Sequence, residues 1–313
     1  MECFSLYTVS VQKEVKGMHK KLPLITTLLL VIGAFAFILS QKQNKPSDFR
    51  DAVREEFQNF DTSISETIFS ARNSQVKETA HEILRPPWKI IDGLDAVPGE
   101  FPFIAIIRSQ TWDKLFSCGG SLIKKNWVLT AAHCTRNAMV GSITIGAYDR
   151  KQLSHTEGLE VFYPTKSIHH PNYDEKNHDY DFSLIRLDGE SKFDPIPLNR
   201  EELGANISLV LAGWGRTEKD GHTASHILQK TSVPLVSADD CRKTWPNITD
   251  NMLCGGYENS PAGAYFGDSG GPVLVGAGAD RKLVGVVSSG KFGKYNKYGK
   301  VSAVVSWIDS MAQ

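Results

Sequence analysis

Short apolar runs separated by polar and turn-forming residues dominate the chain from residue 90 onward. The runs are FPFIAII, SLIKKNWVLTAA, ITIGAY, FSLIRL, SLVLAGW, GPVLV and KLVGVVSS. Gly, Pro, Asn and Asp punctuate them, a pattern typical of the short strands of an all-β barrel or sandwich. Two helices are also predicted. One begins at SADDCRKTW, where Ser237 followed by Asp240 resembles a capping box, and the other is the final VSWIDSMAQ. The lysine-rich stretch 291–300, KFGKYNKYGK, is predicted to be a solvated loop.

The N-terminal residues have a different pattern. A basic region, residues 1–21, precedes the uncharged apolar segment 22–40, LPLITTLLLVIGAFAFILS. This segment is long enough to span a bilayer with its basic side in the cytoplasm. It is equally compatible with a signal peptide, for which AFA at 34–36 is a weak cleavage site. Both readings predict export, so we expect a secreted or extracytoplasmic protein, anchored by residues 22–40 if they are retained.

Residues 41–89 contain no cysteine and carry one apolar stripe with helical spacing. Its members are Phe49, Val53, Phe57, Phe60, Ile64 and Ile68. The prolines of RPPWK, residues 85–89, end this predicted helix. The region is either a helical pro-region that docks or pairs through its stripe, or a solvated stalk that is helical only in part.

Composition narrows the class of protein. The 313 residues carry a formal net charge of zero, which argues against a nucleic-acid partner. Of the five cysteines, Cys3 stands alone, while Cys118 and Cys134, and Cys241 and Cys254, form two local pairs. Two short-loop disulfides and an oxidising compartment fit this placement, and four buried thiols fit the spacing as well.

Candidate chemistry begins with GDSGGP, residues 267–272. A serine hydroxyl needs a base to remove its proton and donors to stabilise the oxyanion that forms on the substrate. Glycine lets backbone N–H groups face a substrate without a side chain in the way. Ser269 is therefore a candidate nucleophile, with the N–H groups of Gly267 and Ser269 as candidate oxyanion donors.

Other motifs accompany this loop. The motif WVLTAAHC contains His133 immediately before its last residue, Cys134, and the motif DFSLIRL begins with Asp181. The other motifs are IIDGLDAVPGEFPF, CGGSLI, AGWGRT and MLCGG. With these motifs in this order, residues 90–313 resemble the chymotrypsin/trypsin family of serine endopeptidases. The resemblance implies two packed antiparallel β-barrels with a C-terminal helix. It also implies peptide-bond hydrolysis through an acyl-enzyme, with His133 as general base and acid, Asp181 orienting it, and Ser269 attacking.

The resemblance further implies a zymogen. Cleavage after Lys89 would free the α-amino group of Ile90, which would turn inward and pair with the Asp268 carboxylate. Because residues 41–117 contain no cysteine, no disulfide would hold the pro-region to the protease domain. If residues 22–40 form an anchor, activation would therefore release the enzyme.

The specificity pocket departs from the trypsin pattern. Gly263 stands six residues before Ser269, where trypsin-like members carry an aspartate, and Ser289 replaces a usual tryptophan. The other expected pocket residues are Ala264, Phe266, Ser288, Gly290 and Gly299. An uncharged pocket favours large apolar or aromatic side chains, whereas Lys291, Lys294 or Lys300 reaching in would select acidic ones. Neither version suits cleavage after Lys89, so a separate activating protease with basic specificity is implied.

The pocket rim differs too. Family members commonly join the position of Tyr265 to the loop at 291–295 by a disulfide, and neither end is a cysteine here. We therefore expect a less constrained rim. The histidines of the loop before Asp181, at positions 169, 170 and 178, are expected to face solvent.

No metal or cofactor is expected. HExxH spacing is absent from the sequence, and Ala147 stands where the first carboxylate of the family's calcium loop is usual, although Glu157 and Glu160 resemble its later members. Expected partners are a polypeptide substrate, the activating protease and protein inhibitors. Asn206 and Asn247 begin glycosylation sequons. The alternative function is a protease-like binding protein that keeps the fold without turnover.

Overall fold

The computed structural model describes residues 93–152, 158–216, 224–260 and 262–313. The predicted basic region, apolar segment and pro-region, together with Lys89 and Ile90, lie outside the described residues. Within those residues no helix has the length and apolar character needed to cross a membrane.

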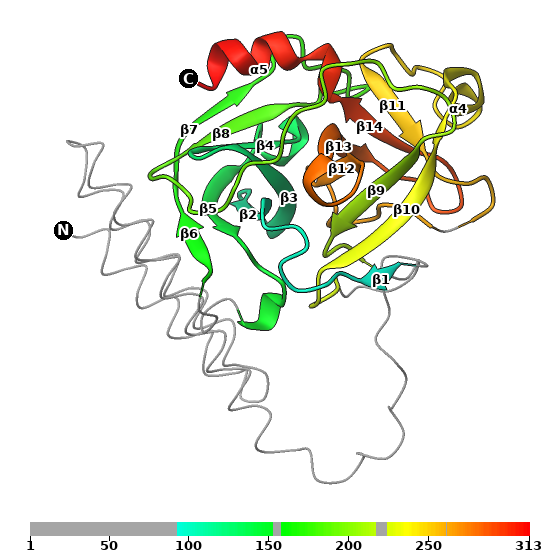
Figure 1. Cartoon of the computed structure of the whole chain (residues 1–313). Helices are drawn as coiled ribbons and strands as arrows, with labels where there is room; N and C mark the ends of the chain where they lie inside the picture. Colours follow the sequence, from blue (N-terminus) through cyan, green and yellow to red (C-terminus); the bar gives the residue numbers. More distant parts are fainter. Residues whose placement is uncertain (1–92, 153–157, 217–223, 261) are drawn as a thin grey trace, which may run out of the picture. The chain divides into compact units, whose positions relative to one another are not determined.

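The first of two antiparallel sheets, called here the first barrel, has the strand order β6-β5-β2-β3-β4-β8-β7 (Figure 1). Its strands β6 and β7 are the two edges. The bounds are β2 Ile104–Gln110, β3 Leu115–Lys124, β4 Trp127–Thr130, β5 Met139–Ile145, β6 Glu160–Phe162, β7 Pro164–His169 and β8 Ser183–Leu187.

The second sheet, the second barrel, has the order β1-β10-β11-β14-β13-β12-β9, and an additional pairing of β9 with β10 closes six of its strands into a barrel. The bounds are β1 Leu94–Asp95, β9 Ser208–Gly213, β10 Gln229–Val236, β11 Met252–Gly255, β12 Pro272–Val275, β13 Lys282–Ser289 and β14 Asn296–Lys300. The predicted all-β class with two packed antiparallel barrels is confirmed, with the second barrel closed and the first a half-barrel that has two edges.

Most apolar strand positions are buried in the barrel interiors. In β8 every residue except Arg186 is buried, which explains its nearly continuous apolar sequence. Large side chains with no exposed surface, such as Ile107, Leu129 and Ile143, fill the first barrel. Tyr298 is equally buried in the smaller apolar cluster of the second barrel.

Both predicted helices are present. Helix α4, Ala238–Thr244, is capped by Ser237, whose hydroxyl accepts from the Asp240 N–H at 3.1 Å. Helix α5, Val305–Met311, buries Val305 and Ile308 in the core of the first barrel although it follows the last strand of the second. Short 3₁₀ helices cover Ala132–Cys134, Arg150–Gln152, Gly278–Asp280 and Val301–Ala303.

Both local cysteine pairs are disulfides, Cys118–Cys134 and Cys241–Cys254. The solvated-loop prediction for 291–300 was wrong in its second half. Residues 296–300 form β14, which is paired on both sides, with β11 and with β13. Lys297 is tolerated there because its ammonium leaves the core to reach the Asn177 carbonyl and the Trp245 ring.

Candidate active site

Asp181 lies two residues before β8 and has no solvent exposure. Its Oδ1 accepts the backbone N–H of His133 at 2.9 Å, and its Oδ2 lies 2.7 Å from His133 Nδ1. The Ser288 hydroxyl also donates to Oδ2, at 2.7 Å. Burial raises the pKa of Asp181, but the hydrogen bonds, chiefly from His133, outweigh burial and hold the pKa well below its ordinary value. A buried, ionised carboxylate therefore orients the His133 ring.

His133 lies in the 3₁₀ turn that follows β4, with its side chain about a quarter exposed, at 23%. The next residue, Cys134, is bonded to Cys118 on β3, so a disulfide holds the turn to the sheet. The ring Nε2 lies 3.7 Å from the Cys134 Sγ. The Ser269 hydroxyl makes no hydrogen bond to any described residue, so it is not bonded to the His133 imidazole. Catalytic hydrogen bonds of this kind often tighten only when substrate binds.

The Ser269 loop is held to both barrels by backbone hydrogen bonds. The Ser269 carbonyl accepts from Gly119 N–H at 2.7 Å, one residue from Cys118, and Gly270 N–H donates to Val287 at 2.8 Å. Gly270 has φ +77°, and a Cβ there would lie 2.2 Å from the Thr130 hydroxyl. The glycine after the serine is therefore required by both conformation and space.

Two free donors flank the Ser269 hydroxyl. Across the described chain, neither the N–H of Gly267 nor that of Ser269 donates a hydrogen bond to a protein group. Gly267 has φ +100° and is exposed at the mouth of the site. Unpaired, fixed N–H groups beside a hydroxyl are what stabilisation of an oxyanion requires.

Asp268 points away from the site and is almost completely buried, with 3% of its surface exposed. Its oxygens accept from Gly215 N–H at 2.8 Å and Tyr265 N–H at 2.9 Å. A Cβ on Gly213 or Gly215 would lie 2.2 Å from one of these oxygens, so glycines make room for the carboxylate. Burial raises the pKa of Asp268 to about 6, and no described cationic group lies within ion-pair distance.

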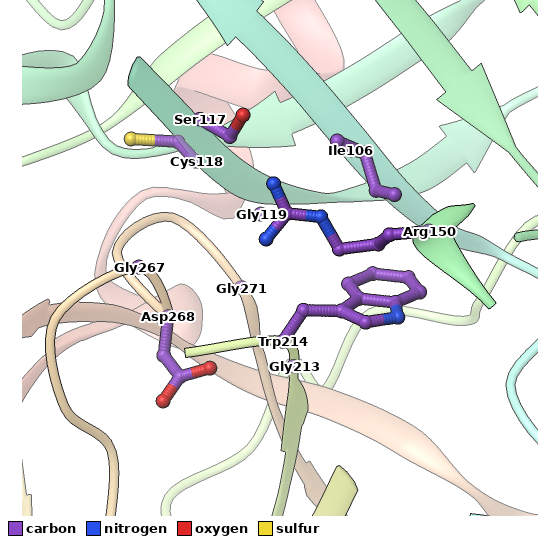
Figure 2. A pocket seen from close by; sticks show the side chains of 10 residues that line it. All are labelled: Ile106, Ser117, Cys118, Gly119, Arg150, Gly213, Trp214, Gly267, Asp268 and Gly271. Atoms are coloured by element: carbon purple, nitrogen blue, oxygen red, sulfur yellow. The ribbon is translucent and has the colours of Figure 1, made fainter. Parts of the chain in front are cut away.

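Among the described residues, Arg150 carries the positive charge that lowers the pKa of Asp268. The two residues line the same small cavity. Figure 2 shows the guanidinium turned into this cavity, alongside the Trp214 indole. The remaining lining residues come from both barrels and are Ile106, Ser117, Cys118, Gly119, Gly213, Gly267 and Gly271. Burial lowers the pKa of Arg150, and Asp268 acts in the opposite direction, so each charge partly compensates the other.

An open pocket adjoins Ser269. It is lined by Ala264, Tyr265, Phe266, Ser269, Val287, Ser288, Ser289 and Gly290. Five of the expected pocket residues are therefore present. Gly263 is not among the lining residues, because the Asn296 side chain occupies the space beside it.

The prediction for Gly299 was wrong. A Cβ at this position would lie 2.6 Å from the Phe182 ring, and Gly299 is paired within β14 to Met252 and Val286. It therefore packs in the barrel interior and does not line the pocket. Asn296, three positions earlier in β14, lies beside Gly290, which does line the pocket.

The three lysines proposed for an acidic-selective pocket are bound elsewhere. Lys291 donates to the Thr244 carbonyl at 3.2 Å and lies over Trp245, and Lys294 lies 3.5 Å from Glu258. Lys300 pairs with Glu202 at 2.7 Å. No charged side chain lines the pocket as described.

An aromatic contact crosses the pocket rim at the place where this sequence lacks the two cysteines of the rim disulfide. The Tyr265 ring packs edge-on against Phe292, with centroids 6.1 Å apart, and against Phe266 at 4.8 Å. Lys294 with Glu258 ties the same loop to residues before the pocket. Apolar and ionic contacts thus link the two segments.

His178 was missed by the sequence analysis. Expected to face solvent, it stacks on His133 and places its Nδ1 3.6 Å from Asp181 Oδ2 and 3.3 Å from the Ser289 hydroxyl. Its backbone has φ +61°, an unusual conformation for histidine. Its position three residues before Asp181 was the available signal.

His169 and His170 were also expected to face solvent, and this prediction was wrong for both. His170 is 7% exposed and stacks on Tyr180, while His169 lies 2.9 Å from the Thr135 hydroxyl. Glu160 of the calcium-like loop accepts from Lys192 N–H at 3.0 Å and from Ser191, and Glu157 lies outside the described residues. Both sequon asparagines, Asn206 and Asn247, are exposed.

Comparison with known proteins agrees with this geometry. A family profile described as Trypsin matches residues 90–308. Trypsin 5G1 of Aedes aegypti is 32% identical over 250 residues, covering 73% of this chain and 90% of that protein. Transmembrane protease serine 5 of Homo sapiens is 32% identical over 243 residues, covering 72% of this chain and 52% of that protein.

A solved structure gives the same picture. Neuropsin, a serine protease expressed in the limbic system of mouse brain, matches with a TM-score of 0.62 and 28% identity. The match covers 72% of this chain and all of that one. This chain belongs to the trypsin family and is a serine endopeptidase.

Proposed function

We propose that His133, Asp181 and Ser269 form the catalytic triad of an exported zymogen that hydrolyses peptide bonds through an acyl-enzyme. The observation that carries the proposal is the bonding of Asp181. Its two oxygens hold both the ring and the backbone of His133, at 2.7 and 2.9 Å. This bonding fixes the proton of His133 on Nδ1, which leaves Nε2 free to accept a proton from Ser269.

The unpaired N–H groups of Gly267 and Ser269 support an oxyanion hole at the same place. Removing one such donor from a serine protease lowers turnover by about 10²–10³-fold, so their availability is a substantial part of the chemistry.

Labelling with a fluorophosphonate tests the triad. Protein cleaved after Lys89 is expected to be modified at Ser269, and the Ser269→Ala variant is expected to remain unmodified. A cleaved, folded protein that is not labelled would favour the competing function, a binding protein that keeps the fold without turnover.

Activation follows from the environment of Asp268. Its carboxylate is buried and has no cationic partner within ion-pair distance among the described residues, which makes its ionised form costly. The α-amino group of Ile90, freed by cleavage after Lys89, would supply the missing cation. Ile90→Glu, or a block to cleavage at Lys89, is therefore expected to abolish turnover while the domain still folds. Full activity of uncleaved protein would contradict this step.

The partners and location follow from the same scheme. The substrate is a polypeptide, the activator is a separate protease with basic specificity, and protein inhibitors are a further class of partner. The apolar segment 22–40 directs the chain out of the cytoplasm as a signal peptide or an anchor. N-terminal sequencing of the protein recovered from medium and from membranes distinguishes these two roles.

A further inference from the structure

Asn296, the first residue of β14, is a buried polar side chain next to Ala264 and Gly290, two residues that line the pocket beside Ser269. Only 3% of its surface is exposed. A Cβ on Gly263 would lie 2.1 Å from its Oδ1, and a Cβ on Gly290 would lie 2.8 Å from its Nδ2. The carboxamide therefore fills the space between these two glycines.

One hydrogen bond fixes which way the carboxamide faces. The Ala264 N–H donates to Asn296 Oδ1 at 2.9 Å. The reversed orientation would set an NH₂ group against that N–H, so oxygen and nitrogen cannot exchange places. The Nδ2 is consequently turned to the Gly290 side, and Gly290 lines the pocket.

The Nδ2 group has no acceptor within the described part of the chain. The described polar atoms that are both fully inaccessible and without a partner do not include Nδ2. Part of the Nδ2 surface is therefore accessible. A buried amide N–H that finds no protein acceptor is satisfied by water or by a ligand. The free Nδ2 donor thus lies beside Gly290, a residue of the pocket wall.

The charge of the pocket limits what this donor binds. As described above, no charged side chain lines the pocket, and the neighbouring lysines are bound elsewhere. Lysine or arginine would enter without a carboxylate, and glutamate would enter without a cation. Each would lose hydration that nothing in the pocket replaces.

We infer that Asn296 determines the specificity of this pocket, and that the pocket selects a side chain ending in an uncharged carbonyl acceptor, that of glutamine. The inference rests on the proposed function and narrows the apolar or aromatic preference expected from the sequence. The relevant position is P1, the residue immediately before the bond that is cut.

The first test uses wild-type protein cleaved after Lys89 and peptides that differ only at P1. Glutamine is compared with methionine, which has similar length and no strong acceptor, and with glutamate, phenylalanine and lysine. We expect kcat/KM for glutamine to exceed that for each of the others by about 10-fold or more, because a site built to hydrogen-bond rejects analogues that lack the group. Preference for phenylalanine or methionine over glutamine would overturn the inference.

Two variants test the role of the side chain itself. Asn296→Asp retains the acceptor for Ala264 N–H and adds a charge, so preference is expected to move to lysine at P1. Asn296→Ala removes the donor, and glutamine is expected to lose its advantage over methionine. Asn172→Asp is the matched control, since Asn172 is exposed outside the pocket and its change is expected to leave the P1 profile intact.

Fluorophosphonate labelling of each protein separates two kinds of failure. Variants that label normally and keep the wild-type P1 profile refute the role of Asn296 and leave the triad standing. Cleaved wild-type protein that does not label refutes the proposed function, and this inference with it.

Discussion

His178 stacks on His133, with ring centroids 5.3 Å apart and planes 27° apart, and both histidines direct Nδ1 to the same oxygen of Asp181. The Nδ1 of His133 is 2.7 Å from that oxygen and the Nδ1 of His178 is 3.6 Å from it. A second imidazole thus supports both the ring and the carboxylate of the proposed triad.

Replacing His178 by leucine removes a polar contact, 3.6 Å long, that helps to lower the pKa of Asp181, and it removes one face of the His133 stack. We expect kcat to fall by about 10-fold with a smaller change in KM, because the loss affects positioning more than substrate binding. Steady-state kinetics of the cleaved protein measures this. His226→Leu, at an exposed histidine far along the chain, is the control, and equal kinetics of the two variants would show that His178 has no positioning role.

Replacing Asp181 by asparagine is expected to lower kcat by about 10⁴-fold, because the carboxamide no longer holds the His133 tautomer. The pKa of Asp181 is depressed in the folded protein, so its ionised form stabilises the fold above the unfolded-state value. That stabilisation is lost as the pH falls through the folded value. Asp181→Asn should therefore lower the free energy of unfolding at pH 7 more than at pH 2–3. Denaturant melts at both pH values check this, and an equal loss at both would contradict it.

Asp268 gives the opposite pH dependence in the uncleaved chain. Its pKa is raised from 3.8 to about 6, so stability is greatest below the unfolded value and falls as the pH rises towards 6. The difference corresponds to about 3 kcal/mol across this window. Chemical denaturation from pH 3.5 to 7.5, with and without Asp268→Asn, measures the slope. Cleavage after Lys89 should flatten it, and identical slopes in all three proteins would exclude the buried-carboxylate argument.

Arg150 contributes to the same titration. Its positive charge lowers the pKa of Asp268, so Arg150→Met is expected to raise that pKa further and to extend the loss of stability above pH 6. Lys151→Met removes an exposed charge from the adjacent residue and serves as control. If both variants keep the wild-type pH profile, the shared cavity does not couple the two groups.

Gly270 tests whether the Ser269 loop depends on space as well as conformation. Gly99 and Gly270 have nearly equal φ angles, +78° and +77°, but a Cβ on Gly99 would meet nothing within 4 Å. Gly99→Ala is expected to cost about 1–2 kcal/mol from backbone strain alone. Gly270→Ala adds the clash with Thr130 and should cost more and abolish labelling of Ser269. Thermal melts and labelling of both variants check this, and equal effects would show that strain alone matters.

The strands and both helices followed from the sequence because their apolar periodicity and caps are local properties. The sequence favoured Asp181 over Asp179 as the triad candidate because Asp181 directly precedes an apolar run. The position of His178 was not predictable in this way, since a left-handed backbone conformation turns its ring onto His133, and neighbouring residues do not encode that contact.

The pocket shows a different limit. Gly299 was chosen by its type and its distance from Ser269. The register of β14 instead pairs Gly299 with Met252 and Val286, and it is Asn296 that lies beside the pocket residue Gly290. The lysines of residues 291–300 suggested a solvated loop because their charge can be read from the sequence. The long-range strand pairing that buries Lys297 cannot be read in this way. Side-chain register in a strand paired at both edges depends on the rest of the sheet.

The central claim is that Ser269 becomes covalently acylated once the chain is cut after Lys89. Acid quenching during turnover of a slowly hydrolysed ester, followed by mass spectrometry of the peptide that contains residue 269, tests it directly. We predict one acyl group on Ser269 in cleaved wild-type protein, and none in His133→Ala or in uncleaved protein. Turnover of the ester by cleaved protein with no acyl group on Ser269, or equal acylation without His133, would contradict the account.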